Sequence, residues 1–223
     1  MHESEQRKRI LITGATGNIG RRLTARLLQD DRYDIRLFVR NSRKVQLSLL
    51  NRVEITEGTT FDSASLDEAV TGVDTAFYLI HSMGSDKDYQ DLDKKSAENF
   101  RSACVRAGVR RIVYLGGLGS TTDELSAHLA SRKEVGRIFA AAKTPATELQ
   151  AAVIIGSGSV SFEMIRHLTE ILPVIMRSRW MRSRCQPIAV RNVLEILISV
   201  IDDPNPVDRL YDIGGPDVLT YEE

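Results

Sequence analysis

Several features that would narrow the function are scarce in this sequence. It has only two cysteines, Cys104 and Cys185, which cannot form a disulfide framework and lack the spacing of a metal site. Its 30 basic residues balance its 30 acidic ones, so charge gives no reason to expect a nucleic acid or an anionic membrane as partner. We therefore expect no metal, no nucleic-acid partner and a reducing, cytoplasmic compartment.

Long apolar runs are also missing. The longest, residues 151–155 and 193–201, are far too short to span a bilayer, and the first ten residues lack the apolar segment of a secretory signal. With 223 residues, of which 42% are hydrophobic, the chain can bury a core of ordinary globular size. We expect a protein without membrane insertion.

Short β-branched runs alternate with amphipathic segments. Strands are predicted at residues 9–13, 33–39, 53–56, 74–80, 111–115 and 147–155. Helices are predicted at 18–29 and, most clearly, at 89–107, where Leu92, Phe100, Ala103, Cys104 and Ala107 fall on one face. This alternation predicts an α/β fold, a Rossmann-type doubly wound parallel sheet over residues 1–155.

The alternation of strands and helices is less regular in residues 156–223. A helix at 161–172, an arginine-rich connection, a strand at 187–190, a helix at 192–201 and a strand at 210–213 are predicted. We expect a small substrate-side subregion of the same domain. Thr220 can cap a new helix just before the sequence stops at Glu223, which suggests truncation before a further C-terminal domain.

A glycine loop, Gly14-Ala-Thr-Gly17-Asn-Ile-Gly20, lies between the first strand and the first helix. Glycine allows positive φ and close approach to a pyrophosphate, whose charge the helix N-terminus stabilises. This context predicts a dinucleotide site; the alternative is a tight turn without a ligand.

The second strand ends at Phe38-Val39-Arg40, where proteins that prefer NAD place an acid for the ribose 2′-hydroxyl. No carboxylate is available there in the sequence. Arg40, with Arg43 or Lys44, instead suits a 2′-phosphate, which favours NADP(H) over NAD(H). The alternative is a solvated basic turn.

The motifs TGATGNIG, LFVR, VDTAFYLIHSMG, RRIVYLGG, PIAVRNVLEIL and YDIGGPDVLTYEE together resemble an extended or atypical short-chain dehydrogenase/reductase. The chain is similar to the NAD(P)-binding domain of bacterial proteins labelled nucleoside-diphosphate-sugar epimerases, to NmrA-like proteins and to the reductase-like accessory subunit of respiratory complex I. The resemblance runs from about residue 9 to residue 223.

This resemblance implies a set of cofactor contacts. They are Gly14, Thr16, Gly17, Asn18, Ile19 and Gly20 for pyrophosphate, Arg40 and Arg43 for the adenosine ribose, Asp62 for adenine, and Leu79, Ile80, His81, Gly116 and Arg132 near the nicotinamide ribose. Thr59 stands where the family has its first adenine-binding acid, which leaves Asp62 as the candidate.

Active members of the superfamily use a serine after the fifth strand and a Tyr-x-x-x-Lys pair on the next helix. Here the serine position falls on glycine, the tyrosine position on His128 and the lysine position on Arg132. His128 can act as a general acid or base, whereas a guanidinium stays protonated. His81 is a second candidate, with Ser82 beside it; either histidine can instead be structural. Tyr78 and Tyr114 fit core packing.

Residues 176–185 carry Arg177, Arg179, Arg182 and Arg184 around Trp180. They can bind an anionic substrate, or form a solvated loop or a docking surface for a C-terminal domain or protein partner. The leading hypothesis is a divergent NADPH-dependent oxidoreductase without the usual Ser-Tyr-Lys set. The alternative is a non-catalytic, NmrA-like module that senses NADPH; a nucleoside-diphosphate-sugar epimerase ranks third.

Overall fold

A single parallel sheet organises the molecule. The computed structural model describes residues 7–81, 89–118, 127–159, 162–163, 166–167, 170, 182–203 and 209–220. The seven strands of the sheet are β1 (Lys8–Thr13), β2 (Tyr33–Val39), β3 (Glu54–Glu57), β4 (Thr75–Tyr78), β5 (Arg111–Gly117), β6 (Ala146–Ala151) and β10 (Arg209–Ile213). Their order is β10-β6-β5-β4-β1-β2-β3, and each neighbouring pair is parallel. The order reverses between β1 and β4, which is where open α/β sheets bind their ligands.

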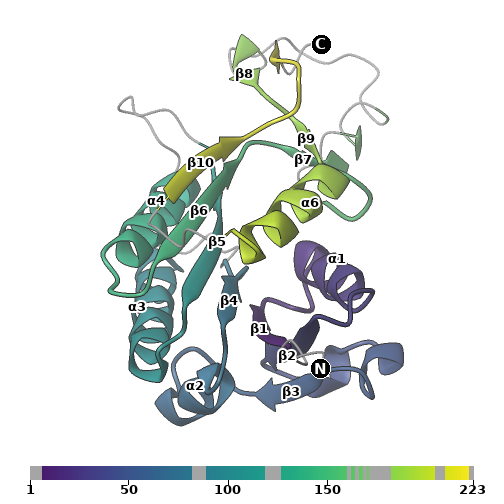
Figure 1. Ribbon diagram of the computed structural model, residues 1–223. Helices are drawn as coiled ribbons and strands as arrows, with labels where there is room; N and C mark the ends of the chain where they lie inside the picture. Colours follow the sequence, from purple (N-terminus) through teal and green to yellow (C-terminus); the bar gives the residue numbers. More distant parts are fainter. Residues whose placement is uncertain are drawn as a thin grey trace.

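Helices cover both faces of the sheet (Figure 1). On one face α1 (Asn18–Leu27) packs beside α6 (Val190–Ile201); on the other lie α2 (Ser63–Val70), α3 (Tyr89–Ala107) and α4 (Ala127–Ala140). Alternate residues of β1 serve the two layers, since Ile10 and Ile12 join the core under α1 and Leu11 joins the other. The doubly wound α/β fold is confirmed.

Two details differ from the expectations. The predicted strand 147–155 is broken after Ala151, and β7 (Ile154–Ile155) pairs instead with β9 (Ile188–Ala189). The apolar run continues across the break, so its pattern could not reveal it. On α3, Leu92 is 49% exposed, while the polar Asp93 and Ser96 are buried in its place.

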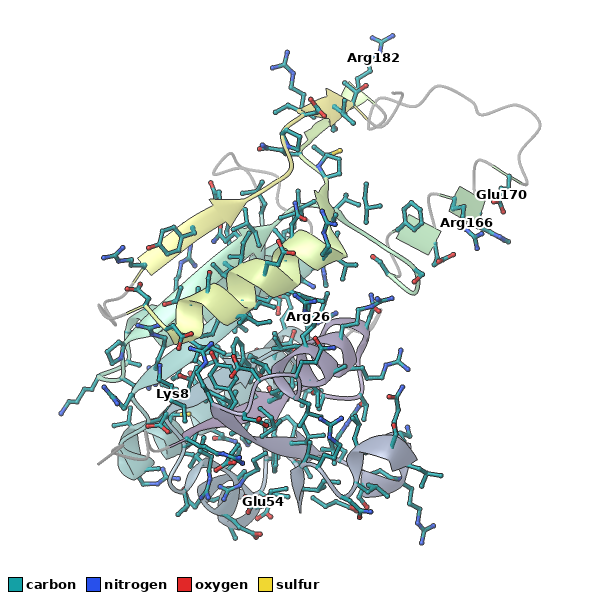
Figure 2. The ribbon with its side chains drawn as sticks, turned by 45° about the vertical axis from the view of Figure 1, so that its right-hand side comes forward. Lys8, Arg26, Glu54, Arg166, Glu170 and Arg182 are labelled. Carbon is teal, nitrogen blue, oxygen red and sulfur yellow. The ribbon has the colours of Figure 1, made fainter. Side chains whose placement is uncertain are left out.

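The later part of the chain returns to the large sheet and also builds small ones. Residues 190–201 and 209–213 form α6 and β10, whereas β8 (Arg184–Cys185) pairs antiparallel with β11 (Leu219–Thr220). Figure 2 shows Arg182 beside this small sheet, at the opposite end of the molecule from Glu54. The predicted helix 161–172 lies mostly outside the described residues, as do Arg177, Arg179 and Trp180.

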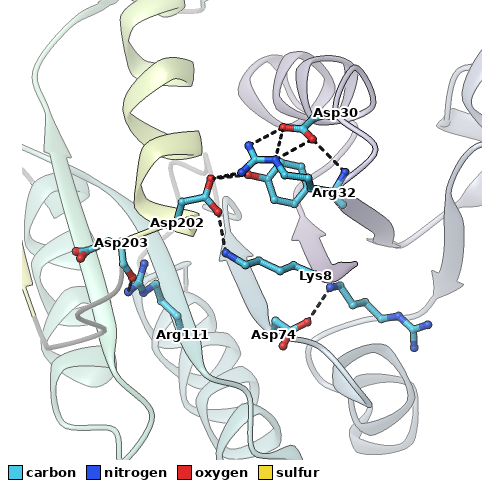
Figure 3. Close-up of polar contacts among 9 residues, drawn as sticks. Lys8, Asp30, Arg32, Asp74, Arg111, Asp202 and Asp203 are labelled. Carbon is cyan, nitrogen blue, oxygen red and sulfur yellow. Dashed lines mark hydrogen bonds and ion pairs between the residues drawn. The ribbon is translucent and has the colours of Figure 1, made fainter. Parts of the chain in front are cut away.

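The amino end of the sheet is closed by a polar network (Figure 3). Asp202, just after α6, accepts hydrogen bonds from Lys8 Nζ (2.7 Å), Arg32 Nη1 (3.1 Å) and the Tyr33 hydroxyl (3.0 Å). Burial and the neighbouring Asp202 raise the pKa of Tyr33 to about 12. The network fastens the end of α6 to β1 and to the start of β2.

Both cysteines are free thiols, Cys104 buried on α3 and Cys185 half-exposed on β8. Across the described residues, no helix is long and apolar enough to cross a membrane. The same residues contain no group of three or more His, Cys, Asp or Glu side chains arranged to hold a metal ion.

Candidate functional site

The glycine loop is tight enough to require glycine at its two ends. Gly14 has φ +65°, and a Cβ there would lie 2.5 Å from the backbone oxygen of Leu79. A Cβ on Gly20 would lie 2.3 Å from the oxygen of Gly14. The Gly17 N–H donates to the Gly14 oxygen at 2.9 Å. The loop thus packs backbone against backbone between β1 and the end of β4.

The N-terminus of α1 is open to an anion. Gly17 is its N-cap residue and supplies no side-chain hydrogen bond, and the first turn contains no acid. Thr16 is exposed beside it, and Ile19 packs on the core. Uncapped N–H groups at a helix N-terminus bind phosphate oxygens well, so the loop fits the pyrophosphate of a dinucleotide.

An arginine joins this helix to the segment that follows β7. Arg22 Nε donates to Asn18 Oδ1 at 3.1 Å, and its Nη2 donates to the oxygen and Oγ of Ser157 at 3.0 and 2.9 Å. Residues 156–159 therefore lie beside the glycine loop.

The turn after β2 has a carboxylate beside it that the sequence did not reveal. Arg40 and Arg43 are both exposed after β2, next to the short η1 helix (Ser42–Lys44). Glu57, the last residue of the adjacent strand β3, accepts the Ser42 N–H through Oε2 at 2.9 Å. That hydrogen bond, with the charge of Arg43, lowers the pKa of Glu57. The turn itself carries no acid, as the sequence indicates, but β3 brings a carboxylate to it.

Asp62, the candidate adenine contact, is the N-cap of α2. Its carboxylate accepts the N–H groups of Ala64 (3.3 Å) and Ser65 (3.2 Å), and these bonds lower its pKa. Its side chain already has a structural partner, as is usual for an N-cap aspartate.

Two histidines meet where β4 and α4 approach each other. Thr13 Oγ1 donates to the Phe77 oxygen (2.9 Å) and accepts the Leu79 N–H (3.2 Å), which fixes the chain after β4 against the glycine loop. Ile80 then packs on the core. His81 follows it; the residue as a whole is exposed, but its ring lies against His128 and near the Arg132 charge. The rings of His81 and His128 lie edge to face with centroids 6.2 Å apart.

Arg132 lies one turn along α4 from His128. A Cβ on Gly117 would come within 2.9 Å of Arg132 Cδ, so the glycine at the end of β5 makes room for this side chain. Its Nε is buried and has no hydrogen-bond partner within the described part of the chain. Desolvation and the Arg132 charge lower the pKa of both histidines, that of His81 to about 4, so both imidazoles are neutral at pH 7.

Asp93 was missed by the sequence reasoning. It is buried on α3 and accepts a hydrogen bond from Ser131 Oγ at 3.0 Å, directly beside Arg132. Its negative charge opposes the effect of Arg132 on the pKa of His81 and His128. The sequence pattern that could have indicated Asp93 is an acidic residue within a helix whose other inward positions are apolar.

The tyrosines are structural, as expected. The Tyr78 hydroxyl is buried against Ser96 Oγ at 2.7 Å, and the Tyr114 hydroxyl donates to the Arg132 oxygen at 3.2 Å. Burial raises the pKa of both phenols. Neither is placed as a proton donor for a substrate.

Two other candidates fall outside this cluster. Gly116 faces the sheet–α4 layer, where a Cβ would lie 2.7 Å from Glu148 Oε1. Ser82 lies outside the described residues. The structure thus brings His81, His128 and Arg132 to one place, and the glycine loop, Leu79 and Arg40 to the adjoining edge.

Comparison with known proteins agrees with this geometry. Residues 14–158 match the NAD(P)H-binding family. A (4-alkanoyl-5-oxo-2,5-dihydrofuran-3-yl)methyl phosphate reductase of Streptomyces griseus is 24% identical over 221 residues, covering 96% of this chain and 70% of that protein. An NmrA-like family domain-containing oxidoreductase of Aspergillus japonicus is 29% identical over 113 residues, covering 48% of this chain and 34% of that protein.

Among solved structures, a nucleoside-diphosphate-sugar epimerase from Staphylococcus aureus has the same fold, with a TM-score of 0.78, 20% identity and coverage of 95% of this chain and 72% of that one. The matched region contains the glycine loop, the ribose turn and both histidines. The chain therefore belongs to the NAD(P)H-binding family and is similar to reductases and to an NmrA-like oxidoreductase.

Proposed function

We propose that the chain is the cofactor-binding part of an NADPH-dependent reductase in which His81, His128 and Arg132 hold the oxygen of the group being reduced. The observation that carries this proposal is the edge-to-face pair of histidines beside Arg132. The pair stands at the carboxyl end of the sheet, two residues beyond the Leu79 backbone that packs on the glycine loop. This is the edge where substrate and nicotinamide meet in folds of this kind.

When bound, reduced NADPH supplies the hydride. The N–H groups of two neutral imidazoles can donate hydrogen bonds to a carbonyl oxygen, and the charge of Arg132 stabilises the negative charge that develops there. Because both histidines have lowered pKa values, their rings are neutral at pH 7 and carry no extra proton to give to the product. We expect the proton on the product oxygen to come from water, with the imidazoles orienting the oxygen.

The cofactor contacts are proposed for residues along the carboxyl edge of the sheet. Gly14, Thr16, Gly17, Asn18, Ile19 and Gly20 form the pyrophosphate cradle; Arg40 and Arg43 face the 2′-position, Asp62 lies near the adenine, and Leu79, Ile80, His81 and Arg132 border the nicotinamide side. Residues 156–223 are proposed to supply the substrate side. Arg182 and Arg184 there, both exposed, suit an anionic substrate.

A second function is favoured by a different observation. Tyr78 and Tyr114 are both committed to buried hydrogen bonds, and a guanidinium replaces the ammonium group of the superfamily's usual lysine. These features support a module that senses NADPH without consuming it.

Fluorescence titration with NADPH and with NADH comes first, followed by NADPH consumption in the presence of aldehydes, enones and quinones. We expect tighter binding of NADPH, slow turnover with at least one acceptor, and about tenfold slower turnover in His128→Ala, the loss typical of one hydrogen-bonding group. His167→Ala, which removes an exposed histidine, is the matched control. Binding without turnover of any acceptor would favour the sensing module, and absence of binding would refute both functions.

A further inference from the structure

The two glutamates of β3 have different partners. Glu54, at the start of the strand, forms an ion pair with the buried Arg36 at 2.9 Å. Glu57, at the end of the strand, lies next to the turn after β2. Its carboxylate accepts the Ser42 N–H there at 2.9 Å. Glu54 thus holds the sheet together, whereas Glu57 places a negative charge on the turn that carries Arg40 and Arg43.

The position of Glu57 is set by the sheet. Glu57 is paired in register with Val39, the residue before Arg40. Gly58 strengthens this pairing, because its N–H donates a hydrogen bond to the Val39 oxygen at 2.9 Å. Strand pairing therefore holds the carboxylate at Ser42, on the turn that carries Arg40 and Arg43, and a ligand at this turn must meet it or displace it.

A 2′-phosphate and a carboxylate compete for the same groups. Both are acceptors for a backbone N–H and for guanidinium groups, and at close range they repel each other. A ribose that carries a free 2′-hydroxyl can instead donate a hydrogen bond to the carboxylate. The turn thus contains two arginines that favour NADP(H) and one glutamate that favours NAD(H).

We propose that Glu57 is a cofactor-specificity residue, a carboxylate that β3 supplies to the ribose turn and that reduces the preference for NADPH which Arg40 and Arg43 create. This inference rests on the proposed function, since it requires that the chain bind both cofactors. The preference of the protein for NADPH is then smaller than its basic turn alone would give.

Glu57→Gln tests this directly. The glutamine keeps an oxygen that accepts the Ser42 N–H, so the shape of the turn is preserved and only the charge is removed. We expect the ratio of NADH to NADPH dissociation constants to rise by about tenfold, as expected for removing one nearby charge at a partly screened surface. Adenosine 2′-monophosphate should gain affinity in parallel, whereas adenosine 5′-monophosphate should not.

Glu68→Gln, which removes the same charge from an exposed position on α2, is the matched control and should leave the ratio within about twofold. If wild type and Glu57→Gln bind both cofactors with the same ratio, the inference is overturned while the proposed function stands. If wild type binds neither cofactor, both fall. A lowered ratio in Glu57→Gln would show that the carboxylate orders the basic turn, which also contradicts the inference.

Discussion

The two ends of the central sheet use polar groups in opposite ways. At the amino end Asp202 gathers Lys8, Arg32 and the Tyr33 hydroxyl into one network (Figure 3). At the carboxyl end the N-terminus of α1 has no side-chain cap, and Arg132 Nε is buried without a partner among the described residues. The amino end uses its charged groups to join α6 to β1 and β2, although Arg111 Nε and Nη1 there are also buried without a partner among the described residues. The carboxyl end instead leaves the N–H groups of α1 open to a ligand.

This difference predicts which variants should change cofactor affinity and which should change the free energy of unfolding. A buried polar group without a partner costs free energy, which a bound ligand can recover. Variants at the carboxyl end should therefore change cofactor affinity first, and variants at the amino end should change the free energy of unfolding first.

The largest effect is expected for Gly14→Ala. The new Cβ meets the Leu79 oxygen and the residue must keep a positive φ, so we expect about 2–4 kcal/mol of destabilisation and at least about a hundredfold loss of cofactor affinity. Gly108→Ala is the control, because Gly108 also has positive φ (+68°) but its Cβ would meet nothing within 4 Å. Calorimetric titration and urea unfolding measure both quantities; unchanged cofactor affinity in Gly14→Ala would contradict the placement of the pyrophosphate.

An intermediate effect is expected for Asp202→Asn. Weakening its bonds to Lys8, Arg32 and Tyr33 should lower the free energy of unfolding by about 1–2 kcal/mol, since these groups are only partly buried. Cofactor affinity should stay within about twofold of wild type. Asp217→Asn, at an exposed position, serves as the control in urea unfolding. A large loss of cofactor affinity would show that the two ends are not independent.

The smallest effect concerns the charge state of the histidine pair. Arg132→Gln removes a positive charge, so the pKa values of His81 and His128 should both rise, as measured by NMR titration of their ring protons. Arg137→Gln, an exposed change on the same helix, should leave them unchanged.

The same shift gives a pH dependence of stability. The pKa of His81 is about 4 when folded, below its ordinary value of 6.5, so the unfolded chain takes up the proton first. Stability should therefore be flat above about pH 6.5 and fall as the pH drops toward about 4. His81→Gln should remove part of that fall; an identical pH profile would place the imidazole in ordinary solvent.

The sequence predicted what depends on periodicity and local motifs. The glycine loop, the strand–helix alternation and the burial of Tyr78 and Tyr114 follow from residue patterns, and the structure agrees with them. The sequence could not predict contacts that depend on which strands pair. Glu57 lies 17 residues from Arg40 in the chain and reaches its turn only because β3 pairs with β2. The contact of Asp93 could not be predicted for the same reason, since its partner Ser131 lies on another helix.

The two thiols become accessible through different opening motions of the molecule. Cys104 lies completely buried on the inner face of α3, and burial raises its pKa, so an alkylating reagent can reach a reactive thiolate only when α3 separates from the sheet. Cys185, half-exposed on β8, needs only a local movement to react. Labelling with a thiol reagent, resolved by peptide mass, would therefore time the release of the small sheet and the opening of the core separately, in one sample and without an added probe.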